Sequence, residues 1–360
     1  MYKIIQFLKK FIATCISIPF IFLKNNTVLF YSPLGRKGNV LYLYEFYHEM
    51  DSSKTKFIDH ELHKFRDLLH VAICLSRSKY LFLTHGVGGL PFSWLLTCRV
   101  QLWHGYPIKK ILLDCAQDSS PMRNKYLNYA YKYIYSIRIK VSYNYLVVSD
   151  SLLGRKTAEA FGFQNTSKVS YIGSPSLDVT NVRSTEFVPD NVFKFLFLPT
   201  WRDGSDVTVE TLKELDFMLS KHAIADFTID VKVHPFELKE ILKNKFENIR
   251  LITDDVGDML NLMNQYNCLI TDYSSCCFEF SILNKPIVFY TPDLENYTKT
   301  RGFYISFSEL IGLNQPIKNC SDLYECLTDV KRKPDDYIYD FIEYIGDSFD
   351  CTKRIYSRFH

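Results

Sequence analysis

Residues 268–304 read CLITDYSSCCFEFSILNKPIVFYTPDLENYTKTRGFY. The run opens with CLI, which predicts a short buried strand, and CCFEFSIL then has the apolar spacing of a helix. NKP predicts the end of that helix because proline cannot continue it, and PIVFY predicts a second buried strand. The stretch therefore predicts a βαβ unit in which the polar loop TDYSS (residues 271–275) joins the first strand to the helix.

The loop TDYSS lies at the carboxyl end of a predicted strand and at the amino end of a predicted helix. Ligands of open α/β sheets bind at such strand ends, and backbone N–H groups at a helix start favour an anion. Ser274 and Ser275 add hydroxyl donors. Helix capping by Asp272 and Ser274 uses the same groups. Phosphate binding and simple capping therefore both stay open at this loop.

The composition bounds the class of protein. A length of 360 residues predicts two domains, and a 47% share of hydrophobic residues supplies a large core. The net charge of +3 is too weak to indicate a nucleic-acid partner, and none is expected. The ten cysteines form no CxxC pair and no disulfide framework, which indicates a reduced, cytosolic chain.

Residues 1–26 are apolar with basic residues near the start. The segment lacks the small residues of a signal-peptide cleavage site, and Pro19 interrupts a run that is short for a membrane span. Two interpretations stay open. One is an amphipathic, membrane-associating helix whose lysines meet anionic lipid, and the other is an ordinary first helix packed on its own domain.

Residues 27–185 predict an N-terminal Rossmann-like domain, because strand, loop and helix patterns alternate. In RVQLWHG (residues 99–105), His104 follows an apolar strand and precedes Lys109 and Lys110. A histidine there suits a general base beside an anion, although a structural role stays open. HELH (residues 60–63) lacks the i, i+4 histidine spacing of a zinc motif, so no metal is expected there.

A polar segment with Pro189 predicts the boundary to a second domain, residues 186–335, and helices are expected in residues 336–360 to pack back on the body. Predicted strands of the second domain end in PTWRD, HP and TDYSS. Because the carboxyl ends of parallel strands meet at one sheet edge, an arginine, a histidine and several hydroxyls are expected to converge. That set suits a pyrophosphate.

Four segments together resemble the CDP-glycerol glycerophosphotransferase family, which makes wall teichoic acid and related phosphate-linked polymers. They are QLWHGYPIKK (101–110), LPTWRD (198–203), VHP (233–235) and the stretch 268–304. The order WHG, HP, TDYSS is a specific combination. The resemblance implies an α/β chain of the GT-B fold, with two Rossmann-like domains facing a central cleft. It also implies a peripheral enzyme on the cytoplasmic face of the cell membrane.

The resemblance implies roles for individual residues. His104 would be the general base that takes the proton of the acceptor hydroxyl, and His234 would stabilise charge on the phosphate. Glu279 stands where the family often has aspartate and would reach the ribose hydroxyls of the donor. The turn GSP with Asp178 is expected to be architectural. The other donor-binding residues would be Thr200, Arg202, Thr271, Asp272, Ser274, Ser275 and Arg301. The acceptor-binding residues would be Gly105, Lys109 and Lys110.

The expected reaction transfers a polyol phosphate, most directly glycerol phosphate from CDP-glycerol, to a hydroxyl of a lipid-linked or polymeric glycan acceptor, and it releases CMP. The product would be teichoic acid, capsule or a related cell-surface polymer. CDP-ribitol enzymes share these motifs, so the polyol stays open. No tightly bound cofactor is expected, and Mg²⁺ on the donor's pyrophosphate stays open. The alternatives are a glycosyltransferase that uses a nucleotide-sugar donor on the same fold, and a non-catalytic scaffold.

Overall fold

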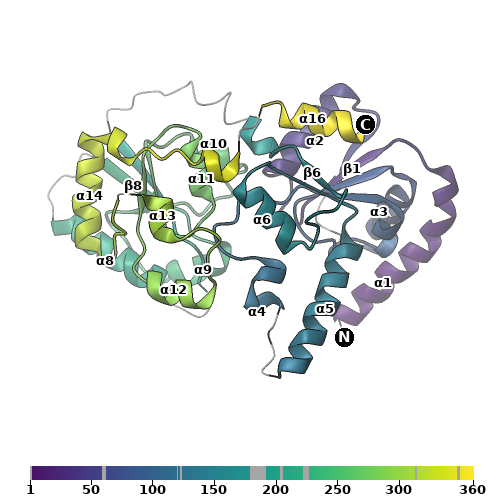
Figure 1. Cartoon of the computed structure of the whole chain (residues 1–360), viewed down its shortest axis with the longest axis horizontal. Coiled ribbons are helices and arrows are strands. Elements are labelled where there is room, and N and C mark those ends of the chain that lie inside the picture. Colours follow the sequence, from purple (N-terminus) through teal and green to yellow (C-terminus); the bar gives the residue numbers. More distant parts are fainter. Residues whose placement is uncertain are drawn as a thin grey trace. The chain divides into compact units, whose positions relative to one another are not determined.

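The computed structural model describes residues 2–58, 62–119, 121, 124–178, 192–202, 206–221, 227–312, 314–346 and 349–360. Contacts divide the chain into two compact units. Unit 1 comprises Met1–Gly105, Ile111–Val179 and Tyr344–His360, and unit 2 comprises Tyr106–Lys110 and Thr180–Glu343. Each unit is built around its own parallel sheet (Figure 1).

The sheet of unit 1 has six strands in the order β2-β1-β3-β4-β5-β6. The strands are β1 (Val28–Tyr31), β2 (Thr55–Ile58), β3 (Tyr80–Leu83), β4 (Cys98–Gln101), β5 (Tyr145–Val148) and β6 (Val169–Tyr171). Every neighbouring pair is parallel. All four residues of β1 are buried, which is typical of a strand with helices on both faces of its sheet.

The helices of unit 1 cover both faces of this sheet. They are α1 (Tyr2–Ser17), η1 (Ile18–Leu23), α2 (Asn39–Met50), α3 (Phe65–Arg77), η2 (Phe92–Leu96), η3 (Leu112–Asp114), α4 (Ala116–Ser119), α5 (Lys125–Ser142), α6 (Leu152–Ala160) and α16 (Cys351–Phe359). Alternate residues of β1 enter two different core clusters, Leu29 and Tyr31 on one face, Val28 and Phe30 on the other. This follows from the two-residue period of a strand.

The sheet of unit 2 has five parallel strands in the order β11-β10-β7-β8-β9. They are β7 (Phe193–Leu198), β8 (Phe227–Val231), β9 (Arg250–Leu251), β10 (Cys268–Thr271) and β11 (Ile287–Phe289). Leu198 pairs with Thr271, so β7 and β10 end at the same level. The loops that follow these two strands therefore leave the sheet side by side.

The helices of unit 2 are α8 (Val207–Lys221), α9 (Pro235–Ile241), α10 (Met259–Met263), α11 (Cys276–Ser281), α12 (Leu294–Thr300), α13 (Phe307–Ile311), α14 (Cys320–Arg332) and η4 (Pro334–Tyr337). The short α15 (Ile342–Ile345) spans the division between the units. The βαβ unit predicted in residues 268–304 is confirmed as β10, α11 and β11. The helix ends two residues before the predicted end, and Asn284 then adopts a positive φ of 53°.

The path of the chain differs from a simple succession of two domains. Residues Tyr106–Lys110 belong to unit 2, although unit 1 both precedes and follows them in sequence. Residues 344–360 return to unit 1, where Ile355 and Phe359 of α16 join the core cluster of β1. Figure 1 shows α16 in yellow beside the purple α2. The predicted boundary between residues 185 and 186 lies outside the described residues.

The N-terminal helix combines features of both interpretations drawn from its sequence. One side of α1 packs on unit 1, where Ala13 contacts the α3 residues Leu68 and Ala72 and Ser17 bonds to Ser93. The other side carries exposed apolar residues. The sequence was expected to be too short here for a membrane span, but the described helical run Tyr2–Leu23 is long and apolar enough to cross a membrane, by length and composition only.

Candidate functional site

His104 follows β4 in a strained turn. Trp103 has φ 56°, a left-handed conformation that costs a non-glycine residue about 1–2 kcal/mol. Two buried side chains hold it. Gln101 Oε1 accepts a hydrogen bond from the Trp103 N–H at 2.9 Å, and Asn39 Nδ2 donates to the Trp103 carbonyl at 3.1 Å. The backbone before His104 is therefore fixed by unit 1 itself.

The imidazole of His104 has a defined hydrogen-bond polarity. Its Nδ1 lies 3.1 Å from the carbonyl oxygen of Thr84. A carbonyl only accepts, so Nδ1 carries the proton and the neutral ring presents a lone pair at Nε2. The side chain has a solvent-exposed edge, but desolvation by the surrounding protein lowers the pKa of His104 below its ordinary value of 6.5. This arrangement favours a neutral base at neutral pH.

His234 has the opposite polarity. It is the N-cap of α9, and its Nδ1 accepts a hydrogen bond from the Phe236 N–H at 3.3 Å. The neutral ring therefore carries its proton at Nε2 and acts as a donor there. Desolvation and the nearby charge of Lys109 lower the pKa of this exposed histidine. The indole of Trp201 stacks on the ring with centroids 5.5 Å apart.

Asp272 of the TDYSS loop binds neighbouring backbone. Its carboxylate accepts from the Thr200 N–H at 2.9 Å and from the Tyr273 N–H at 2.6 Å. Thr271 donates its hydroxyl to the Leu198 carbonyl at 2.8 Å. In the described structure the N-cap of α11 is Ser275, with no side-chain cap bond. Asp272 thus joins the ends of β7 and β10 instead of capping α11.

Arg202 is held by two carboxylates. It forms a bidentate pair with Asp293, at 2.7 Å through Nε and 2.8 Å through Nη2, and Nη2 also lies 2.9 Å from Asp272. Its Nη1 donates to the Thr200 carbonyl at 2.6 Å. Burial alone would lower the pKa of Arg202, but the two carboxylates outweigh burial and raise it. The guanidinium, expected from sequence to face a pyrophosphate, is thus engaged within unit 2.

Lys109 and Lys110, expected from the sequence to bind the acceptor, lie in unit 2. The Lys110 N–H donates to the Gly302 carbonyl at 3.1 Å, which attaches this segment beside Arg301. Lys109 Nζ donates to the Tyr297 hydroxyl at 3.1 Å. Desolvation lowers the pKa of Lys109 to about 8, although Asp272 opposes the shift. Lys109 therefore shares an electrostatic environment with the TDYSS loop, and Gly105 is the last residue of unit 1 before this segment.

The remaining predicted residues surround the same sheet edge. Ser274 and Ser275 are half-buried, and Thr200 is buried with its hydroxyl oxygen unpaired among the described residues. Glu279 on α11 is half-buried, and desolvation raises its pKa to about 7. Asp203 lies outside the described residues.

Asp293 and Tyr297 are contributors that the sequence reasoning missed. Asp293 follows β11 in the run TPD, which is a polar strand end like PTWRD and TDYSS, so the same signal could have found it. The family-like turn around Asp178 is architectural, as expected. The Asp178 carboxylate caps α16 by accepting from the N–H groups of Cys351 at 3.0 Å and Thr352 at 2.7 Å.

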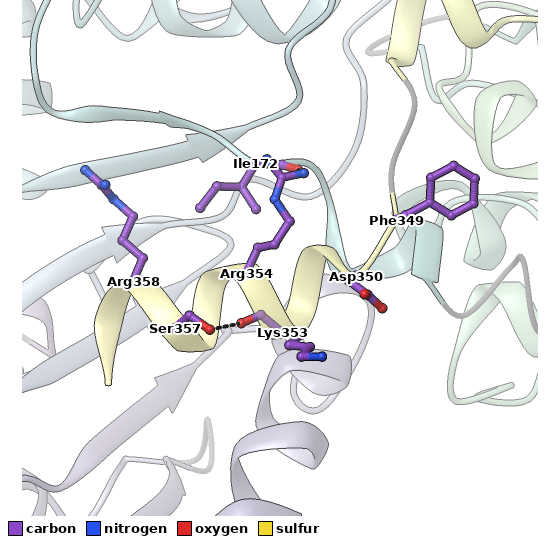
Figure 2. A pocket seen from close by; sticks show the side chains of 7 residues that line it. All are labelled: Ile172, Phe349, Asp350, Lys353, Arg354, Ser357 and Arg358. Carbon is purple, nitrogen blue, oxygen red and sulfur yellow. Dashed lines mark hydrogen bonds between the residues drawn. The ribbon is translucent and has the colours of Figure 1, made fainter.

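A separate hollow of about 710 Å³ lies along α16 in unit 1 and contains none of the predicted site residues (Figure 2). Ile172, Phe349, Asp350, Lys353, Arg354, Ser357 and Arg358 line it. Arg354 is anchored there by a 3.0 Å hydrogen bond to the Ile172 carbonyl.

No cluster of three or more histidine, cysteine or acidic side chains suited to a metal ion occurs in the part of the chain that the structure describes. His60 and Glu61 of the HELH run lie outside that part.

The relatives found by comparison with known proteins agree with one another, because those described here are all named as teichoic acid enzymes. A family model described as CDP-Glycerol:Poly(glycerophosphate) glycerophosphotransferase matches residues 16–349. The teichoic acid ribitol-phosphate primase of Bacillus spizizenii is 28% identical over 280 residues, which cover 74% of this chain and 69% of the relative. The teichoic acid glycerol-phosphate primase of Bacillus subtilis is 28% identical over 243 residues, covering 64% and 59%. The chain spans 30% of the poly(glycerol phosphate) polymerase of Bacillus subtilis.

Solved structures show the same fold. The wall teichoic acid polymerase TagF superposes with a TM-score of 0.74 at 19% identity, covering 94% of this chain and 90% of that chain. A TagF variant soaked with CDPG gives 0.73 at the same identity, covering 94% and 89%. The α/β, GT-B-type fold expected from the sequence is confirmed, with one Rossmann-like parallel sheet in each unit.

Proposed function

Because the chain belongs to the CDP-glycerol:poly(glycerophosphate) glycerophosphotransferase family, we propose that it transfers glycerol phosphate from CDP-glycerol to a hydroxyl of a teichoic-acid-type acceptor and releases CMP. The acceptor oxygen forms a bond to the β-phosphorus of the donor. The bond from that phosphorus to the CMP oxygen breaks, and the hydroxyl proton leaves with the base.

The opposite polarities of two histidines carry this proposal. His104 donates through Nδ1 to a carbonyl and so keeps an acceptor at Nε2, which suits the base that takes the hydroxyl proton. His234 accepts at Nδ1 from a backbone N–H and so keeps a donor at Nε2, which suits a phosphate oxygen that gains charge as CMP departs. The two assignments rest on independent contacts within separate units.

We assign donor phosphate binding to the edge of the unit 2 sheet. Ser274 and Ser275 supply hydroxyls. Lys109, which interacts electrostatically with Asp272 of the same loop and with Arg301, supplies positive charge. We assign Lys109 to donor binding instead of the acceptor binding expected from the sequence, because it interacts with Tyr297 and Asp272. Lys110 and Gly105 remain the proposed acceptor contacts.

A second group of residues builds the frame of this edge. Arg202, Asp272 and Asp293 form a buried charged network, and Thr271 bonds to the backbone of β7. Thr200 belongs to the same frame through its N–H and leaves its hydroxyl for the donor. Glu279 is proposed to bind the ribose, where a carboxyl with a pKa of about 7 forms a hydrogen bond in either protonation state.

Two helices of unit 1 support a membrane surface as partner, and with it a lipid-linked acceptor at the cytoplasmic face. On α1 the exposed face carries Leu8 at 50% and Phe11 at 52% exposure. On α5, Tyr129 and Tyr133 are 80% and 65% exposed, and the same helix carries three lysines and one arginine. Apolar and aromatic side chains mixed with basic residues are typical of helices that lie in a membrane interface. In Figure 1 the N-terminal ends of both helices point toward the bottom of the view.

A donor screen tests the proposed function. Purified protein is given a lipid-linked acceptor and CDP-glycerol, CDP-ribitol or one of several nucleotide sugars, with and without EDTA. We expect CMP and a new phosphodiester from CDP-glycerol. CMP from CDP-ribitol alone would change the polyol and keep the chemistry. A nucleoside diphosphate released from a sugar donor would replace the reaction by glycosyl transfer.

A further inference from the structure

His85 is in ring contact with the proposed base. It follows β3, the strand beside β4, and Leu83 pairs with Gln101 in this sheet. The carboxyl ends of both strands therefore bring His85 and His104 together. Their imidazole rings stack with centroids 4.5 Å apart and planes 7° from parallel. No role for this histidine was expected from the sequence.

The position of His85 is fixed by the same residues that fix His104. His85 Nδ1 lies 3.0 Å from the Thr84 hydroxyl, and the Thr84 carbonyl accepts from His104 Nδ1. The buried Gln101 donates to the His85 carbonyl at 3.3 Å while its oxygen accepts from Trp103. One threonine and one glutamine therefore connect both rings to the sheet.

We propose that His85 is a positioning residue for His104, and this rests on the proposed function. Its ring holds the imidazole plane of His104, so that Nε2 keeps one direction when it takes the acceptor's proton. Its π face also lies against the imidazolium that forms, and an aromatic face attracts a cation. The proton moves from the acceptor oxygen to His104, and His85 neither gains nor loses a proton.

The charge state of His85 suits this role. Burial, and then the neighbouring His104, lower the pKa of His85 to about 3. The ring is therefore neutral when His104 becomes charged. Besides His104, the titratable group bonded to His85 in the described part of unit 1 is Tyr143, whose hydroxyl meets the His85 carbonyl and whose pKa is raised by burial. The other ring against His104 is the indole of Trp103, with centroids 4.1 Å apart, and it carries no charge either.

His85→Ala and His85→Phe test the proposal together. The alanine variant removes the stacked ring, whereas phenylalanine keeps a flat ring of similar size. We expect His85→Ala to lower kcat for CMP release roughly 10–100-fold with the dissociation constant for CDP-glycerol unchanged, because small misplacements cost about 10²-fold. His85→Phe should recover most of that loss. His63→Ala, at an exposed histidine of the same unit, is the matched control.

A second readout does not depend on turnover. NMR titration of ¹⁵N-histidine-labelled protein reports the pKa and tautomer of His104 directly. In His85→Ala we expect the pKa of His104 to rise toward 6.5 as water replaces the ring, and in His85→Phe we expect it to stay low. If no CDP-polyol is a donor, the proposed function fails. The titration still tests whether His85 controls the pKa and tautomer of His104.

The proposal is overturned if His85→Ala keeps the kcat of the unchanged protein, or if the pKa and tautomer of His104 do not respond. Equal losses of kcat and melting temperature in both variants would assign His85 a structural role only. If His85→Ala does not fold, the near-isosteric His85→Phe carries the test alone, and a tenfold loss of kcat in that folded variant would contradict positioning by stacking.

Discussion

At His104 the ring nitrogen Nδ1 faces a carbonyl oxygen, whereas at His234 the same nitrogen faces a backbone N–H. Desolvation acts on both rings in the same direction, and both pKa values are lowered. The local backbone therefore distinguishes the two roles, since it decides which ring nitrogen is left to meet a substrate. The residue types alone, two histidines each followed by glycine or proline, do not contain that information.

His104→Ala is expected to lower kcat for CMP release by about 10²–10⁴-fold, because a general base contributes that much. The dissociation constant for CDP-glycerol should stay near its original value, since the donor contacts are assigned to unit 2. Steady-state turnover and calorimetric donor binding measure the two effects separately. His70→Ala, at another exposed histidine of unit 1, is the control. Normal turnover of His104→Ala would remove this residue from the mechanism.

Lys109 makes donor binding depend on pH. Its pKa of about 8 means that it is charged below that pH and neutral above it. We therefore expect the affinity for CDP-glycerol to fall roughly tenfold as the pH rises from 7 to 9, since a charge-assisted hydrogen bond contributes about 1.5–3 kcal/mol. Titration calorimetry across this range measures it. In Lys109→Arg the dependence should disappear, because arginine stays charged. A pH-independent affinity of the unchanged protein would contradict the assignment.

We expect Arg202→Ala mainly to lower the free energy of unfolding, and to affect donor binding less. The change leaves the buried Asp272 and the half-buried Asp293 without their cation, and breaking a buried pair in this way costs about 3–5 kcal/mol. Urea unfolding followed by circular dichroism measures the loss. Arg250→Ala is a useful comparison, because that arginine pairs with Asp230 from a mostly exposed position. If the Arg202→Ala protein is stable but binds the donor more weakly, Arg202 contacts the donor phosphates directly.

At the scale of elements, strands and helices with a regular apolar pattern could be predicted from the sequence. A position that depends on one contact between distant segments could not. The strands β7 and β10 and the helix α11 were predictable, because apolar runs, turn residues and proline mark their limits. The convergence of PTWRD and TDYSS was predictable, because parallel strands end at one edge. The position of Lys109 was not predictable, since it depends on the backbone bond of Lys110 to Gly302, almost 200 residues later.

The helix α1 gives a prediction of its own. A double variant Leu8→Glu, Phe11→Glu places two carboxylates on the exposed apolar face and leaves the Ala13 side against α3 unchanged. We expect binding to vesicles of anionic phospholipid to fall at least tenfold, because this face loses apolar contact and gains repulsion. Vesicle co-sedimentation measures it. Phe349→Glu, at a 70% exposed phenylalanine elsewhere in unit 1, should bind as before. Unchanged sedimentation of the double variant would exclude α1 as the membrane contact.

At the scale of the whole molecule, unit 1 is completed by the most distant part of the sequence. Ile355 of α16 is fully buried in the core cluster of β1, so Ile355→Ala should cost about 2–5 kcal/mol of unfolding free energy. Ser357→Ala, on the exposed side of the same helix, should cost almost nothing. Chemical denaturation of the two variants measures the difference. Equal stability would show that α16 is dispensable to the core. The tail was expected from sequence to pack back, but its composition did not show on which sheet.

The return of α16 to unit 1 has a consequence for synthesis on the ribosome. Domains generally fold as they emerge, beginning with the N-terminal one. Here the six-stranded sheet is translated early, yet the helix that covers β1 and β3 appears only after all of unit 2 has been made. Until α16 has been made, the nascent chain therefore exposes an apolar face of this sheet, and a chaperone can bind that face. A ribosome stalled within unit 2 should hold an N-terminal half that a protease cleaves readily, and release of the finished chain should protect it.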